Sequence, residues 1–175
     1  HLQICNARLV SPLLFGKLLE KLENLSQEPT ASEWVDHLSC LKLMYLLSYR
    51  TGLRLNEVRC LKIQDIICPE LLYKEKENTV FNNITLHIQD NSYRRLKTRS
   101  ANRQIPLKIA LSEHEFLVVQ RYIQHRYEQY LVNQQDDLLF SVNHRVLTDQ
   151  CISKITVDLF SQILGMHHGF SFHTL

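Results

Sequence analysis

The chain has 175 residues, of which 45% are hydrophobic, and this is enough to build the core of one globular domain. Its formal net charge of +2 is too small to indicate a partner by itself, because recognition depends on where charge is clustered. No run of eighteen uncharged apolar residues and no basic stretch leading into an apolar core is present. We therefore expect neither a membrane span nor a signal peptide.

The cysteines and histidines do not form a recognisable metal or nucleophile motif. The five cysteines are scattered and include no C-x-x-C pair: Cys5, Cys40, Cys60, Cys68 and Cys151. The histidines near the end lack cysteine or carboxylate partners at ligand spacing, and no G-x-S-x-G elbow occurs. We interpret the cysteines as buried or incidental thiols in a reducing compartment and expect no metal and no cofactor.

Hydrophobic spacing in the first third predicts helices around a tight turn. Leucines at steps of three and four from Leu13 to Leu25 indicate an amphipathic helix. The stretch Leu38 to Tyr49 is apolar on almost every side, which predicts a helix at the centre of the core. Gly52 ends this helix, and helical spacing restarts from Val58, so the sequence predicts a helix, a tight turn and a helix.

The middle of the chain changes to the alternation of a strand. Ile84, Leu86 and Ile88 alternate with polar residues, and two further short strands are predicted at Tyr93 to Thr98 and Arg103 to Leu107. Pro106 indicates a sheet edge or the end of a strand. These three segments predict a small three-stranded antiparallel sheet.

Two more helices are predicted in the second half. Ser112 begins a capping box before a helix with Phe116, Ile123 and Tyr130 on one face. Another helix begins near Thr148 and ends at Gly165. The expected fold class is therefore α+β, mainly helical with the small antiparallel sheet, in a single domain over residues 1–175.

Two features of this pattern suggest a binding site. Arg54 lies between the helix-ending glycine and a new helix, where a side chain can leave the packed core, and Glu57 lies one turn further on. Six basic residues without an acid among them fall within fifteen positions, which suits phosphate binding: Arg94, Arg95, Lys97, Arg99, Arg103 and Lys108. An ordinary helix start and a solvated basic face remain the alternatives.

Three segments, in this order, resemble the tyrosine recombinases, the phage integrase family. Residues 51–57 read T-G-L-R-L-N-E and resemble the family's T-G-L-R-x-x-E box. Residues 97–107 read K-T-R-S-A-N-R-Q-I-P-L and are similar to its lysine-bearing hairpin. His173, Thr174 and Leu175 resemble the opening of its H-x-L-R box.

The resemblance implies a role for each matching residue. Arg54 would be the first arginine of the active site, Lys97 the lysine that protonates the departing 5'-oxygen, and His173 the histidine of the second box. Glu57 would support them, and the other basic residues of 94–108 would contact DNA. The family cleaves and rejoins DNA through a 3'-phosphotyrosine without metal, which is nucleophilic catalysis with electrostatic stabilisation.

The resemblance also implies that parts of the family's machinery lie outside this sequence. The second arginine and the nucleophilic tyrosine are expected beyond Leu175, and no N-terminal DNA-binding domain is expected within the chain. We therefore expect a C-terminally incomplete catalytic domain that is inactive alone. None of the chain's seven tyrosines is expected to be the nucleophile: Tyr45, Tyr49, Tyr73, Tyr93, Tyr122, Tyr127 and Tyr130.

The function that the resemblance implies is site-specific recombination, with integration or excision of a mobile element as the task. The expected partners are duplex DNA and further copies of the chain in a tetrameric synapse, in a cytoplasmic, nucleoid-associated protein without a membrane partner. Two alternatives stay open. One is an enzyme similar to the type IB topoisomerases, and the other is a DNA-binding relative that has lost catalysis.

Overall fold

The computed structural model describes residues 9–28, 34–72, 80–96, 98, 101–142 and 146–175. The chain divides into two compact units. The first, here the helical unit, comprises His1–Leu55 and Arg145–Leu175, and the second, here the sheet unit, comprises Asn56–His144. The prediction of a single catalytic domain stays a prediction.

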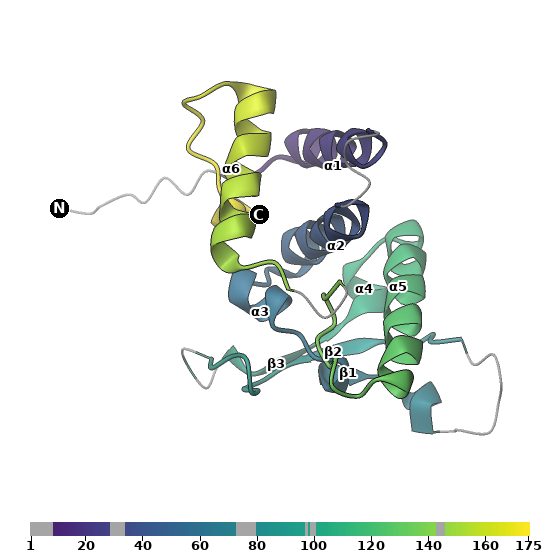
Figure 1. The fold of residues 1–175 in the computed structure, drawn as a ribbon. Coiled ribbons are helices and arrows are strands. Elements are labelled where there is room, and N and C mark those ends of the chain that lie inside the picture. The colour runs from purple at the N-terminus through teal and green to yellow at the C-terminus, as the bar shows by residue number, and fades with distance from the viewer. Residues whose placement is uncertain (1–8, 29–33, 73–79, 97, 99–100, 143–145) are drawn as a thin grey trace. The chain divides into compact units, whose positions relative to one another are not determined.

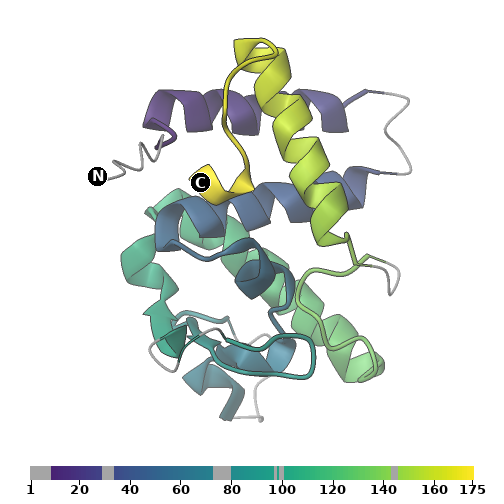
Figure 2. The ribbon, with the colours of Figure 1, turned by 90° about the vertical axis from the view of Figure 1, so that its left-hand side faces the viewer.

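The helical unit contains α1 (Pro12–Ser26), α2 (Val35–Thr51), α6 (Asp149–Leu164) and the short 3-10 helix η5 (Phe172–Thr174). Figure 2 shows α6 crossing α1 and α2. Helix α1 begins where the Ser11 side chain accepts a hydrogen bond from the Leu14 N–H, and it buries Phe15, Leu18 and Leu22. The predicted amphipathic helix is confirmed, with its stripe of large apolar residues facing the core.

Helix α2 is buried around its whole circumference over part of its length, as its apolar sequence predicted. Every residue from Leu43 to Ser48 is buried. The helix ends at Gly52, whose φ of 68° lies in the left-handed region and whose N–H donates to the Ser48 carbonyl at 2.9 Å. Helix α3 (Leu55–Arg59) follows after two residues, which confirms the predicted turn between two helices.

The sheet unit is built on three antiparallel strands in the order β1 (Ile66–Ile67), β2 (Thr85–Ile88) and β3 (Arg103–Pro106). The predicted alternation in β2 is observed, since Leu86 and Ile88 are buried and Thr85 and His87 are half-buried. Strand β3 ends at Pro106, which cannot donate a ladder hydrogen bond, and α4 (Leu107–Ala110) follows it. A mainly helical α+β fold with a three-stranded antiparallel sheet is therefore confirmed.

The strand predicted at Tyr93 to Thr98 is wrong for the described residues of that stretch. Asn91 and Arg94 instead exchange backbone hydrogen bonds across a tight turn, at 2.9 and 3.2 Å. The Asn91 side chain accepts from the Tyr93 N–H and donates to the Cys60 carbonyl, so side-chain bonds replace a strand ladder. The third strand is β1, a two-residue segment too short to show a period, in which Ile66 is buried and Ile67 is exposed.

Helix α5 (Glu113–Val132) lies against the sheet in Figure 1. Ser112 and Glu115 form the predicted capping box, each side chain accepting from the other residue's N–H. Two buried polar side chains of α5 bind backbone carbonyls: Gln120 binds Phe81, and Arg126 binds Leu138. Helix α5 thus holds the segment before β2 and the segment after its own C-terminus by hydrogen bonds as well as by packing.

The unit also contains the 3-10 helices η2 (Ile63–Asp65) and η3 (Pro69–Leu72). Among the residues that the structure describes, no helix is long and apolar enough to cross a membrane.

Alanine substitutions at Gly52 and Gly16 test the effect of the left-handed backbone on stability. A Cβ added at either position would meet no atom within 4 Å, so the two sites differ in backbone conformation and not in packing. Gly52→Ala should lower the free energy of unfolding by about 1 to 2 kcal/mol, since only glycine adopts the left-handed conformation without strain. Gly16→Ala, inside α1, should raise it by about 0.5 to 1 kcal/mol. Urea unfolding curves measure both values, and equal stability of wild type and Gly52→Ala would contradict this account.

Candidate functional site

Arg54 is exposed in the turn that joins α2 to α3. Its neighbours Leu53 and Leu55 are buried, at 3% and 5% exposure, and fix the backbone on both sides. The left-handed Gly52 reverses the chain just before them. The local sequence therefore holds the backbone firmly while it presents the arginine side chain to solvent, as the predicted site requires.

Glu57 lies on α3 and is buried, at 5% exposure. Its carboxylate binds Arg103 of β3 through two parallel hydrogen bonds, Nη1 to Oε1 at 3.1 Å and Nη2 to Oε2 at 2.9 Å. This bidentate geometry is the strongest form of the arginine–carboxylate pair. Arg103, which was predicted to contact DNA, is thus joined to the residue predicted to support the site.

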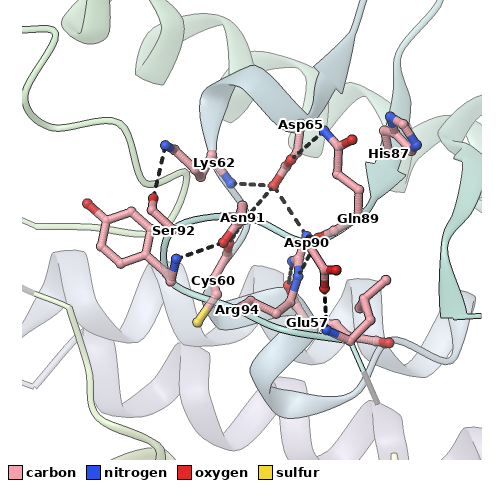
Figure 3. Close-up of polar contacts among 12 residues, drawn as sticks. Glu57, Cys60, Lys62, Asp65, His87, Gln89, Asp90, Asn91, Ser92 and Arg94 are labelled. Carbon is pink, nitrogen blue, oxygen red and sulfur yellow. Dashed lines mark hydrogen bonds and ion pairs between the residues drawn. The ribbon is translucent and has the colours of Figure 1, made fainter. Parts of the chain in front are cut away.

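Arg94 is buried, at 4% exposure, in the centre of a polar network (Figure 3). Its Nη1 donates to the Glu57 carbonyl oxygen at 2.7 Å, and its Nε and Nη2 donate to the Gln89 carbonyl at 3.1 and 2.6 Å. Its Nη2 also lies 3.4 Å from Oδ2 of Asp65. All three guanidinium nitrogens are therefore used inside the protein.

Asp65 is the acceptor around which this network is arranged. Its carboxylate accepts hydrogen bonds from the Lys62 backbone N–H at 3.0 Å, from the Asn91 side chain at 3.0 Å and from the Gln89 side chain at 3.3 Å. It is only 1% exposed. A carboxylate removed from water is stable only when it is paired and hydrogen-bonded, and Asp65 meets both conditions.

The predicted role of Arg94 in DNA contact is corrected by this geometry. A phosphate-binding arginine must present its guanidinium to solvent, whereas that of Arg94 is enclosed and already satisfied by protein oxygens. We therefore assign Arg94 to the fold. Sequence alone could not distinguish it from Arg95, its exposed neighbour.

The remaining basic residues of the segment fall into two groups. Arg95 and Lys108 are exposed. Lys97 and Arg99 lie outside the described residues. Strands β2 and β3 pair as far as Ile88 and Arg103, so the segment 89–102 leaves and re-enters the sheet at neighbouring positions.

The turn at the start of this segment is also held by a charged cluster at the surface. Lys62 Nζ lies 2.5 Å from Oδ2 of Asp137 and 3.3 Å from the Ser92 hydroxyl. The Tyr93 hydroxyl donates to the other oxygen of Asp137 at 3.0 Å. The hydrogen bonds to Asp137 raise the pKa values of both Lys62 and Tyr93 above their ordinary values. Both groups therefore keep their protons when they bind this carboxylate.

His173 is exposed on η5 in the helical unit. The preceding Phe172 is buried, at 2% exposure, and its ring lies 5.6 Å from that of Tyr45. Ser171 and Thr174 close the short helix by hydrogen bonds between the Thr174 hydroxyl and the Ser171 backbone. The chain therefore anchors η5 through Phe172 and leaves the imidazole of His173 in solvent.

Tyr45 shows why a tyrosine of α2 serves packing. It is fully buried, and its hydroxyl lies 2.6 Å from the Thr156 hydroxyl, which itself donates to the Ile152 carbonyl. The Tyr45 hydroxyl is therefore the donor of the pair. Burial raises the pKa of Tyr45 well above its ordinary value, which opposes formation of a nucleophilic phenolate.

The fold resembles that of a known recombinase, although the sequence alone matches no known family. No protein-family model matches the sequence, and no curated protein matches it. Two solved structures of the XerH site-specific recombinase are similar in fold. One, a pre-cleavage complex with difH substrate, is 17% identical with a TM-score of 0.53, and the match covers 95% of this chain and 40% of that one. The other, a post-cleavage complex with palindromic difH substrate, is 16% identical with a TM-score of 0.54, and the match covers 96% and 39%.

This likeness shows that the chain has the fold of a tyrosine recombinase catalytic domain, as the resemblance predicted. The chain spans about two fifths of the length of the XerH chains. Among the described residues, no three histidine, cysteine or carboxylate side chains come together as a metal site.

The adjacent arginines Arg94 and Arg95 provide a matched test of this assignment. Arg94→Ala should lower the free energy of unfolding by about 3 to 5 kcal/mol, because it leaves Asp65 buried without its charged partner. Arg95→Ala should change it by no more than about 0.5 kcal/mol, because that side chain is exposed. Denaturant unfolding of both variants measures the difference, and similar stabilities would contradict the buried network.

Proposed function

We propose that this chain is part of the DNA-cleaving and rejoining domain of a tyrosine-class site-specific recombinase. The single observation that carries the proposal is the exposed Arg54 at the T-G-L-R-x-x-E position of a chain with this fold. In the proposed reaction, a tyrosine hydroxyl attacks the scissile phosphate and displaces the 5'-oxygen. The resulting 3'-phosphotyrosine retains the energy needed to rejoin the strand to a new partner.

Each proposed residue suits its part in that reaction. The planar guanidinium of Arg54 can bind two nonbridging oxygens of the phosphate as negative charge develops on them, which a lysine cannot do in the same geometry. Lys97 would protonate the departing 5'-oxygen. His173 would donate a hydrogen bond to the phosphate or manage the proton of the nucleophile. Glu57 would support the site through its pair with Arg103.

The contacts with duplex DNA are proposed for Arg95 and Lys108, which are exposed and have no acidic neighbours in sequence, and for Arg99 of the same segment. Arg94 is left out of this set, and Arg103 would contribute mainly by holding Glu57. Phosphate contacts of this kind fix the register of the protein on DNA and carry little sequence information.

At the level of the assembly, we propose that four copies act together in a synapse on DNA and exchange strands between two sites, as integration or excision of a mobile element requires. The solved structures with this fold are described as site-specific recombinases, which supports strand exchange over the relaxation of supercoils. The remaining alternative is that the protein is a DNA-binding relative that has lost catalysis.

The proposal is tested by trapping the covalent intermediate with the complete gene product. A preferred DNA site is first selected from a random-sequence library, and a nicked duplex of that site then releases the short strand after cleavage. Wild type should form an adduct that resists denaturing detergent. Arg54→Ala should slow its formation by about a hundredfold to a thousandfold, because a charge that stabilises the transition state is lost.

Arg50 is the matched control, because it is also exposed, lies four residues earlier and packs over the Tyr49 ring at 5.6 Å. Arg50→Ala should retain the wild-type rate, and both variants should unfold at the same denaturant concentration as wild type. An adduct formed by Arg54→Ala at the wild-type rate would refute the assigned role. Absence of any adduct with wild type would favour the non-catalytic rival.

A further inference from the structure

His168 lies in the segment that joins α6 to η5, and it is buried, at 7% exposure. Its ring lies 5.8 Å from that of Phe160 on α6 and 6.2 Å from that of Phe170, and the two phenylalanine rings lie 5.3 Å apart. Neither the resemblance nor the proposed reaction gives this histidine a role. Its neighbour His167 is exposed.

The hydrogen bonds around His168 define its protonation state. The Phe170 backbone N–H donates to Nδ1 at 2.8 Å, so Nδ1 must be without a proton. The Ser161 hydroxyl uses its own proton for the Val157 carbonyl at 2.9 Å, so its oxygen can only accept from the Nε2–H of His168 at 3.0 Å. Both bonds together require the neutral imidazole with its proton on Nε2.

The path of the backbone makes this side chain a structural tie. Gly165 and Gly169 both have positive φ values, 86° and 70°, so the chain turns sharply on both sides of His168. Through Ser161 the imidazole is bound to α6, and through Phe170 it is bound to the residue that precedes the Ser171 cap of η5. The imidazole therefore connects α6 directly to the loop that leads to His173.

We propose that His168 is a positioning residue, whose neutral imidazole sets the position of η5 and with it the position of His173. The catalytic part of this inference rests on the proposed function, in which His173 acts at the scissile phosphate. The structural part does not depend on it. A shift of about 1 Å at a catalytic group can reduce a rate a hundredfold, so a tie of this kind has a measurable effect on catalysis.

Two substitutions separate hydrogen bonding from simple packing. Ser161→Ala keeps the imidazole and its bond to the Phe170 N–H but removes the bond that ties the imidazole to α6. His168→Phe keeps an aromatic ring beside Phe160 and Phe170 but removes both hydrogen bonds. If His168 only fills space, both variants should behave like wild type, whereas a positioning role makes both of them differ from it.

The first measurement is nuclear magnetic resonance of the protein, with no DNA. The nitrogen chemical shifts of the wild-type ring should identify the tautomer protonated at Nε2. His168→Phe should move the resonances of Phe170 and His173 and remove the protection of the Phe170 amide from hydrogen exchange, and Ser161→Ala should move the His173 resonance while the Phe170 amide keeps its protection. His167→Ala is the control and should leave both unchanged. A ring protonated at Nδ1, or a His173 resonance unmoved in His168→Phe, would overturn the proposal.

The second measurement is the rate of adduct formation on the nicked substrate. We expect His168→Phe and Ser161→Ala to be slower than wild type by between about tenfold and a hundredfold, and His167→Ala to remain within about threefold. A rate for His168→Phe equal to that of wild type would also overturn the proposal. If wild type forms no adduct, the proposed function fails, and the resonance measurements alone decide whether His168 positions His173. Should His168→Phe fail to fold, Ser161→Ala alone decides both measurements.

Discussion

A buried charge network between α3 and the turn after β2 is the interaction that sets the conformation of the basic segment in the sheet unit. Arg94 and Asp65 are removed from water together, and the backbone carbonyls of Glu57 and Gln89 satisfy the guanidinium nitrogens that Asp65 does not. Such a pair adds little stability compared with a well-packed apolar core, but breaking it leaves an isolated buried charge. The network therefore specifies one conformation of the turn more than it stabilises the unit.

Glu57 connects this network to the other end of the same segment. Its carbonyl oxygen binds Arg94, before the segment that contains Lys97, and its carboxylate binds Arg103, after it. Two arginines that flank the proposed catalytic lysine in sequence are thus bound to one residue of α3. Among the described residues of the basic segment, Arg94 and Arg103 hold it in place, whereas Arg95 and Lys108 face solvent. DNA binding is proposed for the second pair and not for the first.

The sequence predicted the elements whose signals are local. Leucine spacing and the Ser112 capping box indicated α1 and α5, and Gly52 indicated the end of α2, because helix periodicity and capping depend on neighbouring residues. The prediction of a strand at Tyr93 to Thr98 was wrong because the Asn91 side chain forms hydrogen bonds that replace those of a strand ladder. One of these bonds is to the Cys60 carbonyl, whose position is known only after folding. The exposure of Arg54 could be expected from its position after a helix-ending glycine.

The burial of individual charged residues could not be predicted in the same way. Arg94 and Arg95 are identical in type and adjacent in sequence, and only the folded positions of Asp65 and Gln89 distinguish them. The same holds for His167 and His168, of which only the second is buried beside two phenylalanine rings and bound by two hydrogen-bond partners. In both cases the deciding partner is supplied by tertiary structure.

The most direct test of the central claim is the salt dependence of duplex DNA binding, measured by fluorescence anisotropy over a range of sodium chloride concentrations. Each phosphate contact contributes about 0.9 to the slope of log K against log salt concentration. The account predicts that replacing both Arg95 and Lys108 with alanine makes the slope shallower by about 1.8, while Lys17→Ala, a change at an exposed position on α1, leaves it unchanged. A slope equal to that of wild type in the double variant would contradict the claim that the solvent-facing cations of this segment bind DNA.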